Sequence, residues 1–180
     1  MLICKYDNDI EIHMLELHQA ELILTLAKDY PPTDEWLFPG NTVEAARKFV
    51  QNSLESYAQG KSFRAGIWYK KELAGVIKFS KRILGLQDPV HVKVGELDYM
   101  LAPAFRGKGI ITKACSAMID YAFDELGMKR MEIWVFEENK KSVAIPERLG
   151  FKKEGVLREA FPKLNLAIYG ILKNEWKSAK

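Results

Sequence analysis

The sequence has 180 residues, of which 48% are hydrophobic and 28% are charged, and its formal net charge is +3 at pH 7. This composition is that of an ordinary globular protein with enough apolar material for a sizeable core. The basic residues are spread along the chain rather than gathered in one run, so charge gives no reason to expect direct nucleic-acid binding. The two cysteines, Cys4 and Cys115, show no disulfide pattern, which fits a reducing compartment.

The chain shows no targeting or membrane signal. Its first residues lack the apolar core of a signal peptide, and no run approaches the ~18 apolar residues of a membrane-spanning helix. We therefore expect a cytoplasmic protein with no membrane partner. Since no repeat, low-complexity stretch or linker interrupts the sequence, we expect residues 1–180 to form a single domain.

Apolar periodicity and turn residues divide the chain into strands and helices. In the first half they predict a strand at 9–13, helices at 17–28 and 42–58, and strands at 63–69 and 73–79. In the second half they predict a loop containing Gly85 and Pro89, a strand at 92–101, a helix from 110 to Gly127, a strand at 131–136, a helix at 140–149, and strands at 151–157 and 166–172. Hairpins and crossover helices are mixed in this order. We therefore expect an α/β fold whose mixed, mostly antiparallel twisted sheet of about six to seven strands has helices on both faces.

The sharpest functional signal is the segment Arg106-Gly107-Lys108-Gly109-Ile110, which joins a predicted strand to a predicted helix. The first turn of a helix has backbone N–H groups without intrahelical partners, and the helix dipole adds positive potential there. Glycines let the backbone approach a phosphate closely, and Arg106 and Lys108 add cationic donors. The segment therefore predicts a diphosphate site, although a tight turn without a ligand could use the same glycines.

Two common nucleotide-binding loops do not fit this segment. A P-loop that starts at Gly107 requires Gly-Lys-Ser/Thr at positions 112–114, where the sequence has Thr-Lys-Ala. A dinucleotide-binding loop requires a third glycine at the position of Thr112. The spacing Arg-x-x-Gly-x-small, which Arg106 and Gly109 fulfil, resembles instead the acyl-CoA loop of the GNAT (Gcn5-related N-acetyltransferase) superfamily. Ile111 departs from its small final position.

The second half of the chain strengthens this resemblance. Residues 137–151 are similar to the second cofactor motif of the superfamily, in which an asparagine follows a strand and a helix ends in Gly-Phe. The form Glu-Asn-x-x-Ser-x-x-x-Pro-Glu-Arg-x-Gly-Phe, followed by Glu-Gly-x-Leu-Arg-Glu, resembles the RimJ/RimL-type ribosomal-protein N-acetyltransferases. The resemblance is good over residues 95–176 and diffuse over the first 90.

The resemblance implies an acetyl-CoA-dependent N-acetyltransferase that needs no metal and in which an amine attacks the thioester directly. Residues 1–90 would be the acceptor-side half and residues 91–180 the acetyl-CoA-binding half. Backbone groups of the strand end would hold the pantetheine arm and polarise the thioester carbonyl, as an oxyanion hole does. Asn139 would hold the arm from the other side, or could serve only as a helix N-cap. The cofactor-binding residues implied are Tyr99, Met100, Leu101, Arg106, Gly107, Lys108, Gly109, Ile110, Thr112 and Asn139.

Proton transfer requires a base and an acid. Glu96 aligns with a glutamate of the RimJ/RimL branch and is the candidate base, although a lone glutamate on a strand could also be a solvated surface residue. Ser142, which the branch shares, is the candidate proton donor to the leaving thiolate, because Pro146 stands where many members have a tyrosine. A serine one turn into a helix could equally lie at the surface.

The acceptor side is less determined. Trp36 lies in a segment that forms part of the acceptor groove in related enzymes, and could instead be a core anchor. Asp98 replaces a glycine of the branch, and could attract a cationic amine or face water. Asn165 and Leu166 stand where branch members often have an Asp-His pair, which leaves the identity of the acceptor open.

We expect the acceptor to be a protein N-terminal amine, such as that of a ribosomal protein. An alternative is a small amine such as an antibiotic, polyamine or amino acid, and a second alternative is a non-catalytic CoA-binding module. The resemblance also implies a homodimer. His13, His18 and His91 lack metal-ligand spacing, and Cys115 is predicted to be a core residue rather than a nucleophile.

Overall fold

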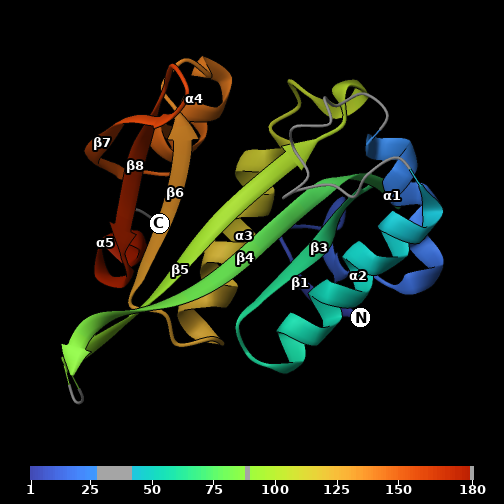
Figure 1. The fold of residues 1–180 in the computed structure, drawn as a ribbon, viewed down its shortest axis with the longest axis horizontal. Coiled ribbons are helices and arrows are strands. Elements are labelled where there is room, and N and C mark those ends of the chain that lie inside the picture. The colour runs from blue at the N-terminus through green and yellow to red at the C-terminus, as the bar shows by residue number, and fades with distance from the viewer. Residues whose placement is uncertain (28–41, 88–89, 179–180) are drawn as a thin grey trace. The chain divides into compact units, whose positions relative to one another are not determined.

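The computed structural model describes residues 1–27, 42–87 and 90–178 (Figure 1). Trp36 and Pro89 lie outside these ranges. The elements are β1 (Leu2–Lys5), β2 (Ile10–Met14), the short 3-10 helix η1 (Leu17–Gln19), α1 (Ala20–Ala27), α2 (Val43–Ala58), β3 (Ser62–Tyr69), β4 (Glu72–Gln87), β5 (Val90–Leu101), the 3-10 helix η3 (Pro103–Phe105), α3 (Ile110–Asp124), β6 (Arg130–Phe136), α4 (Lys140–Arg148), β7 (Lys152–Phe161), β8 (Leu164–Leu172) and α5 (Lys173–Ser178).

The described strands form a sheet of eight strands in the order β1-β2-β3-β4-β5-β6-β8-β7. The pairs β1–β2, β2–β3, β3–β4, β6–β8 and β7–β8 are antiparallel. Strands β5 and β6 are parallel, with Val94 opposite Arg130 and Glu96 opposite Glu132. A parallel pair needs a crossover connection, which α3 provides. The predicted α/β fold with a mixed, mostly antiparallel sheet is therefore confirmed.

The structure differs from the prediction at three elements. Strand β1 was not predicted, because its four residues are exposed or only half-buried and so lack an apolar alternation. The predicted loop around Gly85 is wrong, since β4 continues to Gln87 as the direct sheet neighbour of β5. Its place beside β5 in the sheet carries this strand beyond the run predicted at 73–79. The short terminal helix α5 was also missed.

The chain is organised as two compact units. The first unit contains residues 1–80 and 98–117, and the second contains residues 81–97 and 118–180. The expectation of a single domain, with halves that meet at residue 90, stays a prediction.

The core of the first unit packs α1 and α2 against the sheet. In α2 the residues Ala46, Phe49, Val50 and Ser53 are buried, at the three- and four-residue spacing of one helix face. Thr42 caps this helix as predicted, because its Oγ1 accepts a hydrogen bond from the Ala45 N–H at 3.1 Å. One apolar cluster joins the two helices to β4 and β5, and consists of Leu15, Ile23, Leu26, Phe49, Val50, Val76, Met100 and Ala102.

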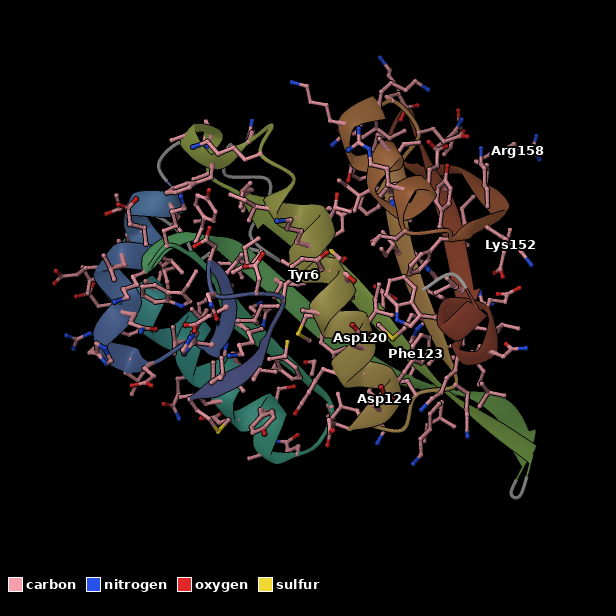
Figure 2. All side chains as sticks on the ribbon, turned by 180° about the vertical axis from the view of Figure 1, so that it is seen from behind. Tyr6, Asp120, Phe123, Asp124, Lys152 and Arg158 are labelled. Carbon is pink, nitrogen blue, oxygen red and sulfur yellow. The ribbon has the colours of Figure 1, made fainter. Side chains whose placement is uncertain are left out.

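The core of the second unit lies on one face of β6 and β8. Alternate residues of β6 are buried on this face, and its register sets Ile133 opposite Tyr169 and Met131 opposite Ile171. The carboxyl-terminal part of α3 contributes Phe123, which Figure 2 shows beside Asp120 and Asp124 on the same helix. The other face of β6 carries Glu132 and Trp134, which follow the opposite phase of the strand alternation.

Gly75 allows β4 and β5 to approach closely in the first unit. A Cβ atom at position 75 would lie 2.1 Å from the carbonyl oxygen of Met100, which is far inside van der Waals contact. Next to it, the Ala102 N–H donates a hydrogen bond of 2.9 Å to the carbonyl of Ala74. Only glycine fits this position without a backbone shift.

We expect Gly75→Ala to lower the free energy of unfolding by about 1–3 kcal/mol, because the new methyl group pushes against backbone rather than a mobile side chain. Urea unfolding followed by tryptophan fluorescence measures the change. Gly155→Ala is the control, since nothing lies within 4 Å of a Cβ at that position. Equal unfolding midpoints for the two variants would contradict the close-approach explanation.

Candidate functional site

The predicted anion loop lies between β5 and α3 in the first unit. The chain leaves β5 at Leu101, makes the short helix η3 and returns to the strand end, where the Arg106 Nε donates a 3.1 Å hydrogen bond to the Leu101 carbonyl. Gly107 and Gly109 have φ values of 77° and 74°, in the left-handed region that favours glycine. The two glycines thus allow the backbone to pass from an exposed loop into the first turn of α3.

The loop presents backbone donors at the amino terminus of α3. The Lys113 N–H donates to the Gly109 carbonyl at 3.2 Å, so the helical bonding pattern starts there and the preceding N–H groups point out of the helix end. Residues 106–109 are exposed, whereas Ile110 is buried and anchors the helix end. Exposed donors, a helix dipole and the cations Arg106 and Lys108 fit a phosphate group.

At the end of β5, before the loop, a ligand could contact backbone groups rather than side chains. Met100 and Leu101 are buried, and Met100 belongs to the core cluster of the first unit. Tyr99 and Thr112, which lies in the first turn of α3, are half-buried. The structure thus brings nine predicted cofactor residues, 99–101, 106–110 and 112, into one strand–loop–helix segment of the first unit. Their contact with the cofactor stays a prediction.

Asn139 and Ser142 lie together in the second unit, at the start of α4. Asn139 is the N-cap of this helix, and its Oδ1 accepts a hydrogen bond of 3.1 Å from the Ser142 N–H. The capping role of Asn139 is therefore confirmed. The cofactor contact of Asn139 and the proton-donor role of Ser142 stay predictions, and Pro146 lies inside the same helix.

Asp98 does not face water in the first unit. Its side chain is 9% exposed, and its Oδ2 lies 3.1 Å from the ammonium of Lys78. This ion pair already compensates the charge that would attract a cationic amine. A direct substrate contact by Asp98 stays a prediction, as does one by Trp36, whose position lies outside the described residues.

Glu96 is paired with an arginine in the second unit. The Arg82 Nη2 lies 3.4 Å from the Glu96 Oε2, and the same nitrogen donates a short hydrogen bond to the Glu132 Oε2. The Arg82 guanidinium also lies over the ring of Trp134, 5.1 Å from its centroid. Three neighbouring strands, β4, β5 and β6, thus contribute to one charged cluster.

Glu132 is the fixed anion of this cluster. Its carboxylate accepts hydrogen bonds of 2.8 Å from both the Arg130 Nε and the Trp134 Nε1. Burial raises the pKa of Glu132, but these bonds and the charge of Arg82 outweigh burial and lower the pKa below its ordinary value. Arg130 extends the cluster to β7, where it pairs with Glu154.

Gly170 makes room for the pair between Arg130 and Glu154. A Cβ atom at position 170 would overlap the Arg130 guanidinium and the Glu154 carboxylate, whose side chains therefore cross over β8 at this glycine. We call the five residues Arg82, Glu96, Arg130, Glu132 and Glu154 the charge network.

The charge network borders a cavity of about 540 Å³ in the second unit. Four of its members line the cavity, and Glu96 is joined to it through Arg82. The lining residues are Arg82, Leu84, Val92, Arg130, Glu132, Trp134, Glu154, Gly155, Ile168 and Leu172. The lining of the cavity thus combines four charged side chains of the charge network with apolar side chains.

Sequence reasoning missed Arg82, Arg130, Glu132 and Glu154. A signal was present in the strand predicted at 131–136, where Glu132 alternates with the apolar residues Met131 and Ile133. A charged residue in a strand flanked by apolar neighbours needs a partner if it is buried. The sequence does not say which of the many arginines supplies that partner.

Three further features belong to the part of the chain that the structure describes: the candidate metal ligands, the cysteine of α3 and the helices. There, no group of three or more His, Cys, Asp or Glu residues could hold a metal ion. Cys115 is fully buried, as predicted, and burial raises the pKa of its thiol. Among the described helices none is both long and apolar enough to cross a bilayer.

Comparisons with known proteins agree on one family. The family described as Acetyltransferase (GNAT) domain matches residues 10–152. YdaF of Bacillus subtilis (strain 168), whose provisional name is ribosomal N-acetyltransferase, is 34% identical over the full length of both chains. The ribosomal-protein-serine acetyltransferase of Escherichia coli (strain K12) is 31% identical over 87% of this chain and 86% of its own.

Two solved structures have a similar fold and sequence. One, described as Probable acetyltransferase, has a TM-score of 0.83 and 32% identity, and the match covers 98% of this chain and 99% of the other. The microcin C7 self-immunity acetyltransferase MccE, solved with acetyl-CoA and AMP, has a TM-score of 0.78 and 26% identity over 93% of this chain and 94% of its own.

We expect Gly109→Asp to weaken CoA binding tenfold or more, which is about 1.4 kcal/mol, because it places a carboxylate in the anion site. Isothermal titration calorimetry with CoA measures the affinity. Gly60→Asp is a matched control, since Gly60 has a similar φ of 66°, also has nothing within 4 Å of a built Cβ, and lies after α2. Unchanged affinity in the folded Gly109→Asp protein would remove the loop from the cofactor site.

Proposed function

The chain belongs to the acetyltransferase (GNAT) family, and from this premise we propose that it acetylates the N-terminal α-amine of a protein such as a ribosomal protein. It is an acetyl-CoA-dependent N-acetyltransferase, and its resemblance to the RimJ/RimL branch is confirmed by relatives named for ribosomal substrates. A protein acceptor is supported by those names, and the choice of an α-amine by the chemistry of the proposed base.

Acetyl-CoA is the co-substrate and supplies an activated acetyl thioester. The residues present fit this group, because two left-handed glycines and the cations Arg106 and Lys108 surround free backbone donors at the start of α3. In our proposal these residues bind the diphosphate. Backbone groups of residues 99–101 bind the arm and polarise the thioester carbonyl, and Asn139 holds the arm through polar groups that its capping bond leaves available.

The ion pair of Glu96 is the observation that favours an α-amine. An amine must lose a proton before or during attack, which at pH 7 costs roughly 1–1.4 kcal/mol for an α-amine and about 4.6 kcal/mol for a lysine side chain. Arg82 lies 3.4 Å from the Glu96 carboxylate, so the candidate base is an ion-paired carboxylate and a modest base. A base of this kind is adequate for an α-amine and poorly suited to lysine.

The proposed reaction has one transfer step. The amine nitrogen forms a bond to the acetyl carbon, and Glu96 accepts the proton that the nitrogen loses. The bond between carbon and sulfur then breaks, and the Ser142 hydroxyl donates a proton to the leaving thiolate, to be replaced from solvent. Ser142 is half-buried, and the bond from its N–H to Asn139 fixes its backbone at the start of α4.

Asn165, which departs from the Asp-His pair of the RimJ/RimL branch, has a local structural role. Its Oδ1 accepts a 3.0 Å hydrogen bond from the Glu159 N–H, and so it organises the tight hairpin between β7 and β8. Glu159 and Lys163 both have left-handed φ values in this hairpin. Asn165 therefore has a local structural role of its own. The cytoplasmic location and the homodimer stay predictions.

The proposed function is tested by supplying acetyl-CoA, a thiol reporter and two panels of acceptors. One panel contains peptides with a free N-terminus and no lysine, and the other contains antibiotics, polyamines and free amino acids. We expect turnover on the peptides and none on the same peptides with a blocked N-terminus. Turnover on small amines alone would replace our proposal with the small-molecule alternative, and CoA binding without any turnover would favour the non-catalytic module.

We expect Glu96→Gln to lower kcat/KM about a hundredfold near pH 6 and much less near pH 9, because the amine needs no base once solvent has deprotonated it. The pH–rate profile with the best peptide acceptor measures this. Glu125→Gln is the control, as Glu125 is an exposed acid of the same unit outside the charge network. A loss that is equal at every pH would exclude Glu96 as the base.

A further inference from the structure

We propose that Arg82 is the positioning residue of Glu96: its guanidinium keeps the Glu96 carboxylate ionised and oriented for proton transfer from the acceptor amine. This inference rests on the proposed function, in which Glu96 is the base. It starts from the geometry of one nitrogen, the Arg82 Nη2, which contacts Glu96 at 3.4 Å and also donates a hydrogen bond to Glu132.

Arg82 is held by contacts other than the one with Glu96. Glu132 binds the end of its guanidinium, and the ring of Trp134 lies beneath it. The Arg82 Nε is buried with no hydrogen-bond partner among the described residues, which costs free energy. The guanidinium keeps this unfavourable position because the contacts at its other end outweigh the cost. The position of Arg82 is therefore supported by contacts other than the one with Glu96.

Glu132 can serve as a permanent counterion. Its side chain is 6% exposed and accepts hydrogen bonds from Arg130, Trp134 and Arg82. Arg130 is itself tied to Glu154 across Gly170. A carboxylate with three donors stays ionised over the pH range in which amines are acetylated. Because Arg130 also holds Glu132, Glu132 does not depend on Arg82 alone, and Arg82 contacts Glu96 as well.

The two glutamates that share Arg82 differ in accessibility. The Glu96 side chain is 19% exposed, about three times the exposure of the Glu132 side chain. The charge network holds three carboxylates and two guanidinium groups, so it carries one excess negative charge. When Glu96 accepts a proton from the amine nitrogen, that excess disappears, and Arg82 remains paired with Glu132 throughout the step.

Three charged residues of the described strands lie near Glu96 in the sheet. Arg82 faces it from β4, Glu132 stands opposite it on β6, and Asp98 lies two residues further along β5 on the same side of the strand. Asp98 is neutralised by Lys78. Removal of Arg82 takes one positive charge away from Glu96 while Glu132 stays opposite it, which should make the carboxylate easier to protonate.

The first test needs no acceptor. In protein with ¹³C-labelled glutamate, the side-chain carboxyl signal of Glu96 is assigned by its loss in Glu96→Gln and followed through a pH titration. We expect Arg82→Gln to move the midpoint of this titration upward by about one pH unit, and Arg82→Lys to restore most of the change, since lysine keeps the charge. Arg82→Gln should fold, because Glu132 retains Arg130 and Trp134 as donors.

The second test is kinetic and uses the best peptide acceptor. The acid limb of the pH–rate profile should move upward in Arg82→Gln by the same amount as the titration midpoint, with roughly tenfold lower kcat/KM on that limb. KM for acetyl-CoA should stay unchanged. Lys152→Gln is the control, because it removes a cation of the same unit that pairs with Glu175 at the surface; its profile should match the parent protein.

The outcomes separate this inference from the function on which it rests. A Glu96 midpoint that does not move in Arg82→Gln overturns the inference, whatever the enzyme acetylates. A midpoint that moves while the acid limb stays fixed also overturns it, since the ion pair is then structural only. Parallel shifts of the two, with rescue by lysine, support it. Failure of the proposed function is detected by a different measurement: the parent protein then turns over none of the peptides.

Discussion

The parallel pairing of β5 with β6 is the constraint on which the rest of the structure depends. Two parallel strands cannot be joined by a hairpin, so the chain must leave the end of β5, cross over and return. Here the return passes through η3, the glycine loop and α3. The loop therefore comes to lie where a strand ends and a helix begins, which is the arrangement that gathers unpaired backbone donors. Topology places the predicted cofactor loop, and its two left-handed glycines allow the backbone to enter α3.

The same strand pair also determines the arrangement of the charge network. Because Glu96 and Glu132 are opposite each other in a parallel register, both side chains lie on one face of the sheet. Two adjacent carboxylates on neighbouring strands repel unless a cation lies between them. Arg82 supplies that cation from β4, and Arg130 and Glu154 continue the alternation of charge to β7. The network is thus a consequence of sheet register as much as of residue choice.

Three positions of the chain require glycine for different physical reasons. Gly75 lets β4 approach the backbone of Met100, and Gly170 leaves space for the Arg130–Glu154 pair. Gly109 has open space around it and is required instead by its left-handed backbone. The first two glycines could not be interpreted from the sequence, since the atoms that exclude a Cβ come from strands distant in the chain. The third could, because its reason is local.

The sequence by itself determined the local features of this protein: the strand–loop–helix segment around Gly109, the caps at Thr42 and Asn139, and the family to which these motifs belong. Each depends on residues within a few positions of one another, where spacing fixes geometry. Only the tertiary structure decided that β4 extends to Gln87, that Asp98 is paired, and that Arg82 lies between two glutamates. Those facts depend on strand order and register, which bring together side chains whose spacing along the chain carries no information about contact.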